Sequence, residues 1–408
     1  MCSLEYVTPA SGCWGVIRIA MLVPESRELF ICPSACGRHG SIGASEVGLK
    51  HRLSYLFIDQ SDIIDGYEEL IINTVPQFLS QVSPRPKVLF LFVSCLDDLI
   101  GTNHEAVISE LRRRVPDVEF AFGHMNPISL DSKTPPPVST QRMMYDLLKP
   151  QEGKDRAVNL IGNLEDVPGS ELYTLLEAAG YKLRHISHYS AFEGFQEMAR
   201  SSYNLVLDAQ GKLAAESMRS RLSIPFSFLP VDYSLEANDR YYDILQKELG
   251  LGQLDPKPFR DEAERSIDQA LDMLSGYPLA LDNSGAVRPY SLAAALSEYG
   301  FNVALVAAPE PKAPDKEGYK RLMALRPDIP IIDPAGVKGV RERGFLPECV
   351  AVGSAAGYLT GSVHPCRMSW DTGFWGYRGI TGLMQLIMKG YRERADLRAI
   401  IKSQGLVI

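Results

Sequence analysis

The sequence predicts an α/β protein made of three Rossmann-like domains, with parallel sheets flanked by helices. Short β-rich apolar runs alternate along the chain with longer amphipathic segments, which is typical of strand–helix–strand units around a parallel sheet. The run VLFLFV at residues 88–93 is entirely apolar, as expected for a strand that is buried on both faces. The chain has 408 residues, which is too long for one core at about 150 residues per domain.

The first predicted domain, residues 1–150, carries most of the chemically informative positions. Its expected strands are residues 54–58, 88–93 and 118–122, and its expected helices are residues 67–82 and 103–114. A proline cluster at residues 134–138 (TPPPV) interrupts the pattern and predicts a loop.

The second and third predicted domains cover residues 151–275 and 276–408. Strands are expected at residues 157–162 and 204–208, followed by a loop at 250–258 and a helix at 260–276. The third domain opens with a strand at 278–282, a turn Asn-Ser-Gly, a helix at 290–299 and a strand at 302–306. This order is a complete βαβ unit. The domain ends with the motif SWDTGFWGYRG at residues 369–379.

The bulk composition excludes several classes of protein. A formal net charge of −8 argues against a nucleic-acid partner, because phosphate binding requires a basic face. No apolar run approaches the roughly 20 residues that a membrane helix requires. The start MCSLE has neither a basic segment nor an apolar core and is not a secretory signal. The seven cysteines are therefore expected to be reduced thiols in a cytoplasmic protein.

Three cysteines lie where a backbone turn would present a thiol to a metal cluster. Cys13 follows a glycine, Cys36 precedes one, and Cys95 directly follows the apolar run that predicts a buried strand. The carboxyl ends of parallel strands border the crevice in which open α/β sheets bind ligands. Thiolates there select iron–sulfur clusters or zinc over hard cations. A single buried cysteine, by contrast, is more often a small core residue than a ligand.

The spacing favours a cluster over structural zinc, which usually takes four ligands in close pairs such as C-x₂-C. The three cysteines are instead spread from position 13 to position 95. Cys32 and Cys36 flank a Pro-Ser-Ala segment, so either could be the middle ligand. The glycine after Cys36 favours Cys36, because a bulky cluster requires close backbone approach and an unusual φ. Three ligands from one chain suggest a cluster that another group completes or that is shared with a second subunit.

Other candidate sites are weaker. The turn at residues 353–357 (GSAAG) could direct backbone N–H groups at an anion, or it could be a tight strand-to-helix turn. His124 follows an expected strand and could border a cavity, although such a histidine is more often structural. Asp97 and Asp98 are expected to open the helix that follows them. The chain has no G-x-x-x-x-G-K-[ST] loop and no G-x-G-x-x-G fingerprint, so electrons would come from a protein donor.

Several motifs together resemble the nitrogenase component 1 family. The order is Gly-Cys near the start, Cys-Gly after a loop of small residues, QSDIIDG at residues 60–66 and SCLDDLIG at residues 94–101. The segment MSWDTGFWGYRG at residues 368–379 is similar to the closing motif of the family. These anchors occur in the family's order and span nearly the whole chain.

The resemblance implies three Rossmann-like domains and a working unit that is a homodimer or an α2β2 heterotetramer of such chains. It implies that Cys13, Cys36 and Cys95 bind an iron–sulfur cluster, 4Fe–4S or larger, that bridges subunits. Electrons would come from an ATP-hydrolysing iron protein under anaerobic conditions. A tetrapyrrole substrate or a second metallocofactor is also compatible with the family.

The chain departs from the nitrogen-fixing α subunit at its cofactor ligands. Asp208 takes the place of the family's thiol, and Met368 takes the place of its imidazole. His364 and Cys366 lie close by in the sequence and could supply imidazole or thiolate ligation, or could be packing residues. The chain is therefore not expected to be a nitrogen-fixing α subunit.

The function expected from the resemblance is that of a reductase subunit, which passes electrons from the cluster to a tetrapyrrole or to a small sulfur or carbon compound. A scaffold on which a complex metallocluster matures is the alternative. A binding protein in which the cysteines are merely buried is a third reading.

Overall fold

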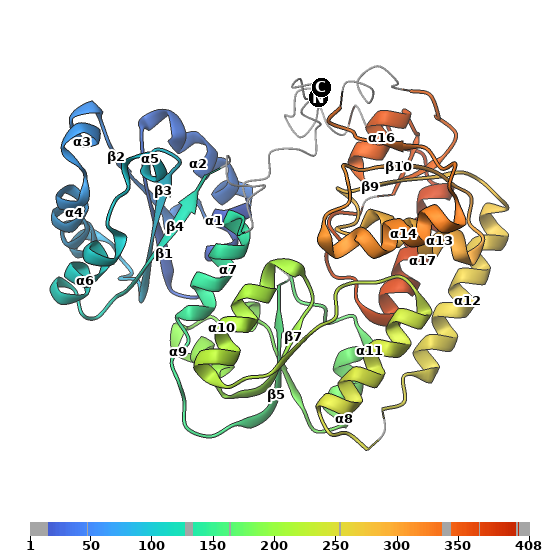
Figure 1. The fold of residues 1–408 in the computed structure, drawn as a ribbon, viewed down its shortest axis with the longest axis horizontal. Helices are drawn as coiled ribbons and strands as arrows, with labels where there is room; N and C mark the ends of the chain where they lie inside the picture. The colour runs from blue at the N-terminus through green and yellow to red at the C-terminus, as the bar shows by residue number, and fades with distance from the viewer. Residues whose placement is uncertain are drawn as a thin grey trace. The chain divides into compact units, whose positions relative to one another are not determined.

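The computed structural model contains three separate parallel sheets, each flanked by helices (Figure 1). The structure describes residues 15–46, 48–126, 134–162, 165–252, 254–336, 344–366, 368–396 and 399. The predicted α/β class with three Rossmann-like sheets is confirmed. Among the described residues, no helix is both long enough and apolar enough to cross a membrane.

The first sheet has the strand order β2-β1-β3-β4, and all of its strands are parallel. Its strands are β1 (Ser26–Cys32), β2 (Leu53–Phe57), β3 (Val88–Ser94) and β4 (Glu119–Met125). The helices within this part of the chain are α1 (Gly15–Ala20), α2 (Gly37–Glu46), α3 (Gln60–Asp65), α4 (Glu68–Gln81), α5 (Asp97–Ile100) and α6 (His104–Arg114). Three predicted strands and two predicted helices are thus confirmed to within a few residues.

The side chains of β3 alternate between two cores, one on each face of the sheet. Phe90 and Phe92 pack in the core that includes residues of α1 and α2. Leu91 and Val93 pack in the core that includes residues of α4 and α6. Every residue of β3 is buried, which explains why the sequence shows an apolar run rather than an alternating pattern.

The central strand β1 is not among the predicted strands. Its second and third residues, Arg27 and Glu28, are charged, whereas a buried strand is expected to be apolar. Glu28 is nevertheless fully buried, and burial raises the pKa of its carboxyl well above the ordinary value, while the nearby Arg52 acts in the opposite direction. Arg52 in turn donates hydrogen bonds to the carbonyls of Met21 and Val23.

The proline cluster at residues 134–138 was predicted to be a loop, and this is wrong for its later part. Helix α7 (Pro136–Asp146) begins inside the cluster. Proline is well tolerated in the first turn of a helix, where its missing N–H would have no partner and its φ is already helical. The cluster therefore starts a helix rather than interrupting one.

The second sheet has the strand order β6-β5-β7-β8, again with parallel pairs only. Its strands are β5 (Asp155–Ile161), β6 (Lys182–Arg184), β7 (Ser201–Val206) and β8 (Phe226–Phe228), and the helices of this part of the chain are α8 (Glu171–Ala178), α9 (Phe192–Phe195) and α10 (Lys212–Leu222). The fully buried side chains of Asn159 and Asn204, partners in register, form a hydrogen bond of 2.8 Å. This bond satisfies polar groups that would otherwise be costly to bury.

The third sheet has the order β11-β10-β9-β12-β13 and is also parallel. Its strands are β9 (Leu279–Asp282), β10 (Val303–Ala307), β11 (Ile331–Ile332), β12 (Val350–Val352) and β13 (His364–Cys366). The helices are α11 (Leu235–Glu248), α12 (Lys257–Leu274), α13 (Pro289–Tyr299), α14 (Lys316–Leu325), α16 (Ser354–Thr360) and α17 (Gly376–Arg392). The predicted βαβ unit is confirmed as β9, α13 and β10.

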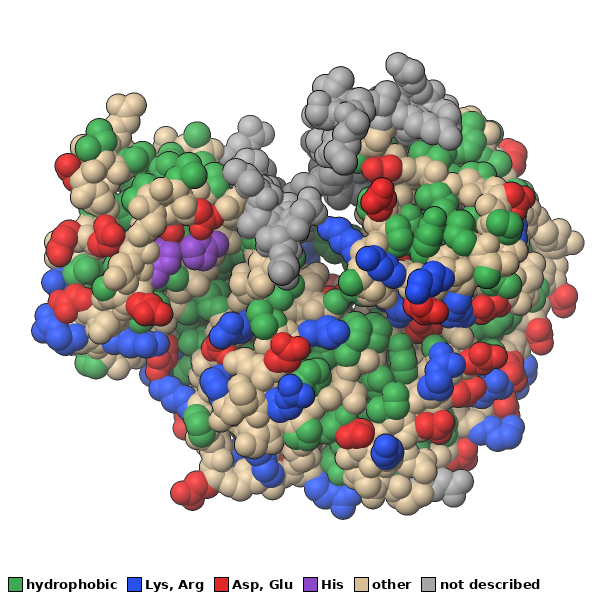
Figure 2. Space-filling view, viewed as in Figure 1, with side chains coloured by type: hydrophobic (Ala, Val, Ile, Leu, Met, Phe, Trp, Pro, Cys, Tyr) green, Lys and Arg blue, Asp and Glu red, His purple; other side chains and the backbone are tan. Residues whose placement is uncertain are grey.

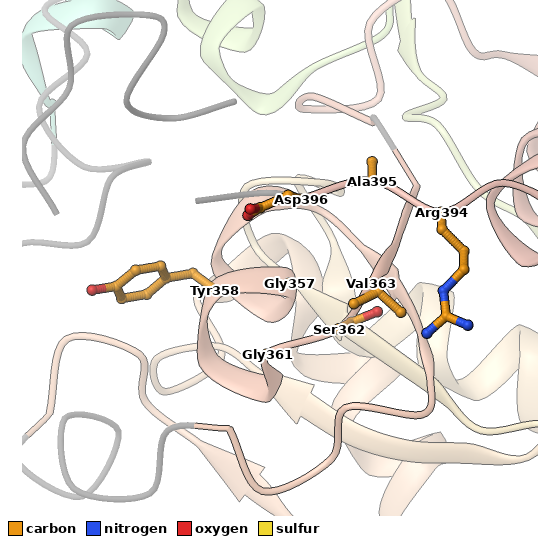
Figure 3. Close-up of a pocket in the computed structure, with 8 residues that line it drawn as sticks. All are labelled: Gly357, Tyr358, Gly361, Ser362, Val363, Arg394, Ala395 and Asp396. Carbon is orange, nitrogen blue, oxygen red and sulfur yellow. The ribbon is translucent and has the colours of Figure 1, made fainter. Parts of the chain in front are cut away.

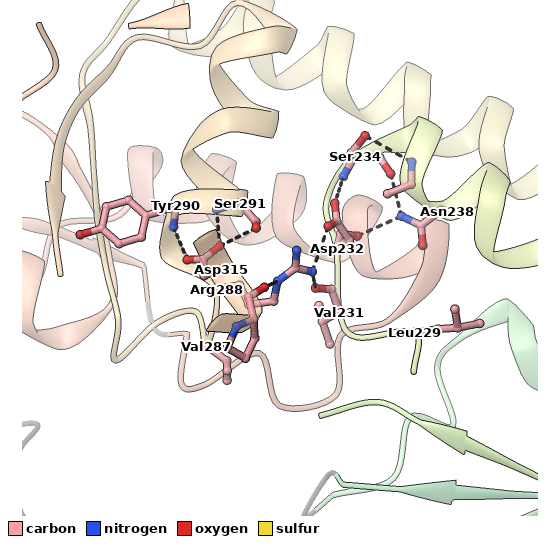
Figure 4. A network of polar contacts seen from close by, with 12 residues as sticks. Leu229, Val231, Asp232, Ser234, Asn238, Val287, Arg288, Tyr290, Ser291 and Asp315 are labelled. Atoms are coloured by element: carbon pink, nitrogen blue, oxygen red, sulfur yellow. Dashed lines mark hydrogen bonds and ion pairs between the residues drawn. The ribbon is translucent and has the colours of Figure 1, made fainter. Parts of the chain in front are cut away.

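Buried polar contacts fix the start of α13 (Figure 4). The Asp315 carboxylate accepts hydrogen bonds from the backbone N–H groups of Tyr290 and Ser291, at 2.8 and 2.9 Å. Arg288, the residue before the helix, forms an ion pair of 3.0 Å with the buried carboxylate of Asp232. A carboxylate at a helix N-terminus is favourable because it accepts from unpaired N–H groups and opposes the helix dipole.

The described residues fall into two compact units. One comprises residues within 13–164 and 182–228 and holds the first and second sheets; the other comprises residues within 165–181 and 229–408 and holds the third sheet. The domain limits expected from the sequence, 1–150, 151–275 and 276–408, stay a prediction.

Candidate functional site

Cys36 and Cys95 lie at the same edge of the first sheet. Strands β1 and β3 are parallel neighbours, with Ile31 beside Val93, so their carboxyl ends coincide. Cys95 directly follows β3, and Cys36 ends the short 3₁₀ turn (Ser34–Cys36) that follows β1. Burial, and secondarily the nearby Cys95, raises the pKa of the Cys36 thiol. Two thiols from separate loops therefore lie close enough for Cys95 to affect the pKa of Cys36.

Cys32 differs from Cys36 in its surroundings. It is the last residue of β1, is fully buried and belongs to an apolar core with Phe30 and Phe92. Burial, with a smaller contribution from Cys36, raises the pKa of Cys32 to about 12. Cys36 and Cys95 are only partly buried. Because metals bind the thiolate form, these surroundings favour Cys36 over Cys32 as a ligand.

The glycine after Cys36 does not have the unusual φ that the sequence suggested. Gly37 has φ −59°, an ordinary helical value. A Cβ at this position would lie 3.1 Å from the ring of Phe57 and 3.2 Å from the ring of Tyr55. The glycine is therefore explained by close packing against two aromatic rings.

The third predicted ligand, Cys13, lies outside the described residues. Cys36 and Cys95 are brought together, and the membership of Cys13 in the same set stays a prediction.

Beside Cys95, two acidic residues and two histidines form a polar cluster that the sequence did not reveal as such. Asp97 and Asp98 do open α5, as expected. The Asp97 carboxylate is however buried, with Oδ2 2.8 Å from Nε2 of His104. Asp98 Oδ1 lies 3.0 Å from Nδ1 of His124 on β4. The sequence gives only a weak indication of this cluster, because His104 lies in α6 and His124 lies in β4, and no spacing motif connects the two.

His364 and Cys366 lie on β13 in the other unit, and both are buried. The Nδ1 atom of His364 lies 3.1 Å from the carbonyl of Gly390 and 2.9 Å from that of Glu393. Burial raises the pKa of Cys366 far above the ordinary thiol value. These contacts account for both side chains as packing residues, and their role as ligands stays a prediction.

Asp208 follows β7 and caps a short turn, accepting a hydrogen bond of 2.8 Å from the N–H of Gln210. Enclosure of its carboxyl raises the pKa of Asp208 to about 6. A Cβ on Gly162 would lie 2.7 Å from the carbonyl oxygen of Asp208, and Gly162 has φ +103°. The close approach of the β5 and β7 ends thus requires glycine. Met368 belongs to the other unit and is buried.

The closing motif has a structural role at the start of α17. The buried Glu171 carboxylate accepts hydrogen bonds from the N–H groups of Tyr377 and Arg378, at 2.6 and 3.0 Å. Trp375 is buried and donates its indole N–H to the carbonyl of Leu229 at 2.9 Å. Gly376, with φ +74°, leaves space that the Glu171 carboxylate fills. The motif therefore fixes the N-terminus of a long helix.

In the turn at residues 353–357, backbone N–H groups donate to side chains of the protein itself and not to an external anion. The Asp282 carboxylate accepts from the N–H of Ala356, and the Ser284 hydroxyl accepts from that of Ser354 at 3.1 Å. An internal carboxylate thus occupies the position that an external anion would take.

A cavity of about 500 Å³ lies beside α16 (Figure 3). Its lining includes Tyr358, Ser362, Arg394 and Asp396. The described lining residues include none of the predicted ligands.

Comparison with known proteins agrees with this architecture. The family described as Nitrogenase component 1 type Oxidoreductase matches residues 14–389. A solved structure of nitrogenase Cp1 at pH 6.5 matches with a TM-score of 0.74 and 16% identity, over 100% of this chain and 97% of that chain. A second solved structure, of nitrogenase Cp1 at pH 5, matches with a TM-score of 0.62 and 16% identity, over 94% of this chain and 87% of that chain. No curated protein sequence matches.

Proposed function

Because this chain belongs to the nitrogenase component 1 type oxidoreductase family, we propose that it is a reductase subunit whose cluster is held by Cys13, Cys36 and Cys95. The observation that carries the proposal is the convergence of Cys36 and Cys95 at one sheet edge. The substrate we propose is a tetrapyrrole or a small sulfur or carbon compound. A second bound metallocofactor is compatible with this role.

The donor set fits an iron–sulfur cluster of 4Fe–4S size or larger. Cys36 and Cys95 are only partly buried, whereas Cys32 is fully buried in the core. Soft thiolates are the ligands that such clusters require. When bound, the cluster would supply one-electron transfer, and the protein would set its potential through burial and hydrogen bonds.

The residues around the two thiols have separate tasks in this proposal. The strand β3, which is buried throughout, provides a rigid support for Cys95. The packing of Gly37 against Phe57 and Tyr55 holds the turn that carries Cys36. Ligands on rigid supports are presented with little loss of conformational entropy on binding.

We propose two partners for this function. The first is a homologous component 1 chain, in a homodimer or an α2β2 heterotetramer, because three cysteines from one chain leave a cluster incompletely ligated. The second is an iron-protein-like ATPase that donates electrons, because the sequence contains no nucleotide fingerprint of its own. Because the net charge is −8, we propose no nucleic acid among the partners.

Iron content and electron paramagnetic resonance (EPR) test the proposal directly. The protein is purified anaerobically with its co-encoded partners, iron and sulfide are counted per chain, and a spectrum is recorded after reduction. We expect about four irons per dimer or more, with a signal that Cys95→Ala abolishes. A folded, iron-free protein under these conditions would overturn the reductase reading and leave the thiols as core residues.

The alternative function is that of a scaffold for the maturation of a complex metallocluster. Asp208 and Met368 in place of the family's cofactor ligands would suit transient binding. The two functions differ in their outcome with ATP and reductant. A reductase turns over a substrate, whereas a scaffold releases its cluster to an apo-protein and then becomes iron-poor.

A further inference from the structure

Three metal-binding side chains meet beside the first sheet without taking part in the proposed cysteine site. One ligand atom from each of Asp97, His104 and His124 lies within 4.8 Å of the others. Asp97 opens α5, His104 opens α6, and His124 lies on β4. All three belong to one compact unit. Figure 2 shows histidine side chains at the surface of this part of the molecule, next to acidic side chains.

Each of the two imidazoles lies within ion-pair distance of a carboxylate. His104 Nε2 lies 2.8 Å from Asp97 Oδ2, and His124 Nδ1 lies 3.0 Å from Asp98 Oδ1. Within the described part of the chain, neither nitrogen has a hydrogen-bond partner of acceptable geometry, although both atoms are buried. A buried nitrogen without a well-formed hydrogen bond calls for a further partner, such as a bound ion or water molecule.

The surroundings hold each of the three groups in position. The other Asp97 oxygen, Oδ1, accepts a hydrogen bond from the hydroxyl of Tyr67. The His104 ring stacks on Phe122, with centroids 4.3 Å apart, and lies 5.0 Å from the ring of His124. Outer partners of this kind orient metal ligands and are nearly as important as the ligands themselves.

We propose that Asp97, His104 and His124 bind one divalent first-row transition-metal ion, separately from the cysteine site. Two imidazoles and one carboxylate form a borderline donor set that prefers ions such as Zn²⁺, Fe²⁺ or Co²⁺ over Mg²⁺ and Ca²⁺. Ligand atoms around such an ion are spaced by about 3.3 Å in a tetrahedral site. The ligand atoms, which lie within 4.8 Å of one another, therefore need to approach by up to about 1.5 Å, which the partly exposed His124 side chain can supply.

The site lies close to the surface, beneath two partly exposed histidine rings. The side chains of His104 and His124 are 20% and 37% exposed although the two ring nitrogens are buried, so a rotation of the His124 ring would admit an ion and a water molecule that completes the coordination. Asp97 lies two positions after Cys95. An ion bound here would therefore also order the short segment that carries the Cys95 thiol.

Anaerobic titration with Co²⁺ tests the site, because its visible absorption distinguishes imidazole and carboxylate ligands from thiolates. The full chain carries Cys36→Ser and Cys95→Ser, so that the proposed cluster cannot form. We expect one equivalent of Co²⁺ to bind without thiolate charge-transfer absorption. His104→Gln and His124→Gln should each weaken binding by about 100-fold or more, and Tyr67→Phe by about 10-fold.

His51→Gln is the matched control, since His51 is exposed and lies outside the cluster; it should bind Co²⁺ as the parent does. His124→Gln changes a partly exposed side chain and keeps the test valid if His104→Gln fails to fold. Absence of Co²⁺ binding, binding that survives both histidine variants, or binding with thiolate absorption would overturn the proposal. Because the thiols are already replaced, these outcomes are independent of the iron content that tests the reductase proposal.

Discussion

The carboxylate of Asp282 occupies the space that any side chain on residue 353 would need. A Cβ built on Gly353 would lie 2.1 Å from Oδ1 of Asp282. The same carboxylate accepts hydrogen bonds from the N–H groups of Ser284 and Gly285, at 2.6 and 2.8 Å, and from that of Ala356 in α16. One buried acid thus joins the turn after β9 to the first turn of α16.

Gly353→Ala should therefore destabilise the third-sheet unit strongly. The substitution adds a clash with Asp282 to the cost of a positive φ of 103°, and strain of this kind costs about 1–3 kcal/mol. Gly300→Ala is the matched control, because Gly300 has a similar φ of +97° but open space around its Cβ position. We expect a clearly larger fall in the thermal midpoint for Gly353→Ala. Equal falls would show that backbone strain alone, without the clash, accounts for the effect.

The choice between Cys32 and Cys36 gives a second prediction. Cys36→Ala should lower the bound iron, since its thiol lies near Cys95 and is partly buried. Cys32→Ala should leave the iron content intact and lower the thermal midpoint, because it removes a fully buried core side chain. Iron per chain after anaerobic purification is the measurement. Loss of iron in Cys32→Ala but not in Cys36→Ala would reverse the assignment.

Glu171 is expected to be essential for the stability of the N-terminus of α17. Its carboxylate accepts hydrogen bonds from the Tyr242 hydroxyl and the Tyr377 N–H, both at 2.6 Å. In Glu171→Gln an NH₂ group, which cannot accept a hydrogen bond, would replace one of the two carboxylate oxygens. Loss of hydrogen bonds to a charged group should lower the free energy of unfolding by about 3 kcal/mol. Differential scanning calorimetry should show a lower midpoint than for Glu177→Gln, an exposed position on the same helix. Equal midpoints would contradict this role.

The raised pKa of Asp208 predicts that the free energy of unfolding depends on pH. Burial raises the pKa of Asp208 from the ordinary 3.8 to about 6, so the folded state holds this proton more tightly than the unfolded state. The contribution of Asp208 to stability is thus complete below about pH 4 and is lost as the pH rises through about 6.

Asp208→Asn should raise the thermal midpoint at pH 7 relative to the unsubstituted chain, and should change it little at pH 4. The amide oxygen of asparagine can still accept the hydrogen bond from Gln210. Thermal melts at both pH values test this, with the exposed Asp243→Asn as the control. A midpoint difference that does not vary with pH would contradict the predicted titration.

The element pattern was largely predictable, and the failures have identifiable causes. The apolar run of β3 and the βαβ unit of β9, α13 and β10 follow from local periodicity. Strand β1 was missed because Arg27 and Glu28 interrupt its apolar pattern, although Glu28 is fully buried in the folded chain. The start of α7 at Pro136 was missed because proline was read only as a helix breaker.

The features of the candidate site also fall into those that the sequence predicts and those that it does not. The place of Cys95 at a strand end, and the position of Cys36 after a short loop, could be read from the sequence because both depend on local order. The burial of Cys32 in the core with Phe92, and the ordinary φ of Gly37, could not, because they depend on the packing of separate elements.

The sequence by itself determined the α/β class, the family and the place of Cys95 at the end of a buried strand, because strand periodicity and ordered motifs are properties of the linear chain. Only the tertiary structure decided which groups meet through space. Asp97, His104 and His124 come together because α5, α6 and β4 converge at one edge of a parallel sheet. The Asp282 carboxylate accepts a hydrogen bond from the first turn of α16 because β9 and β12 are neighbours. Such juxtapositions depend on register and packing, which local pattern does not encode.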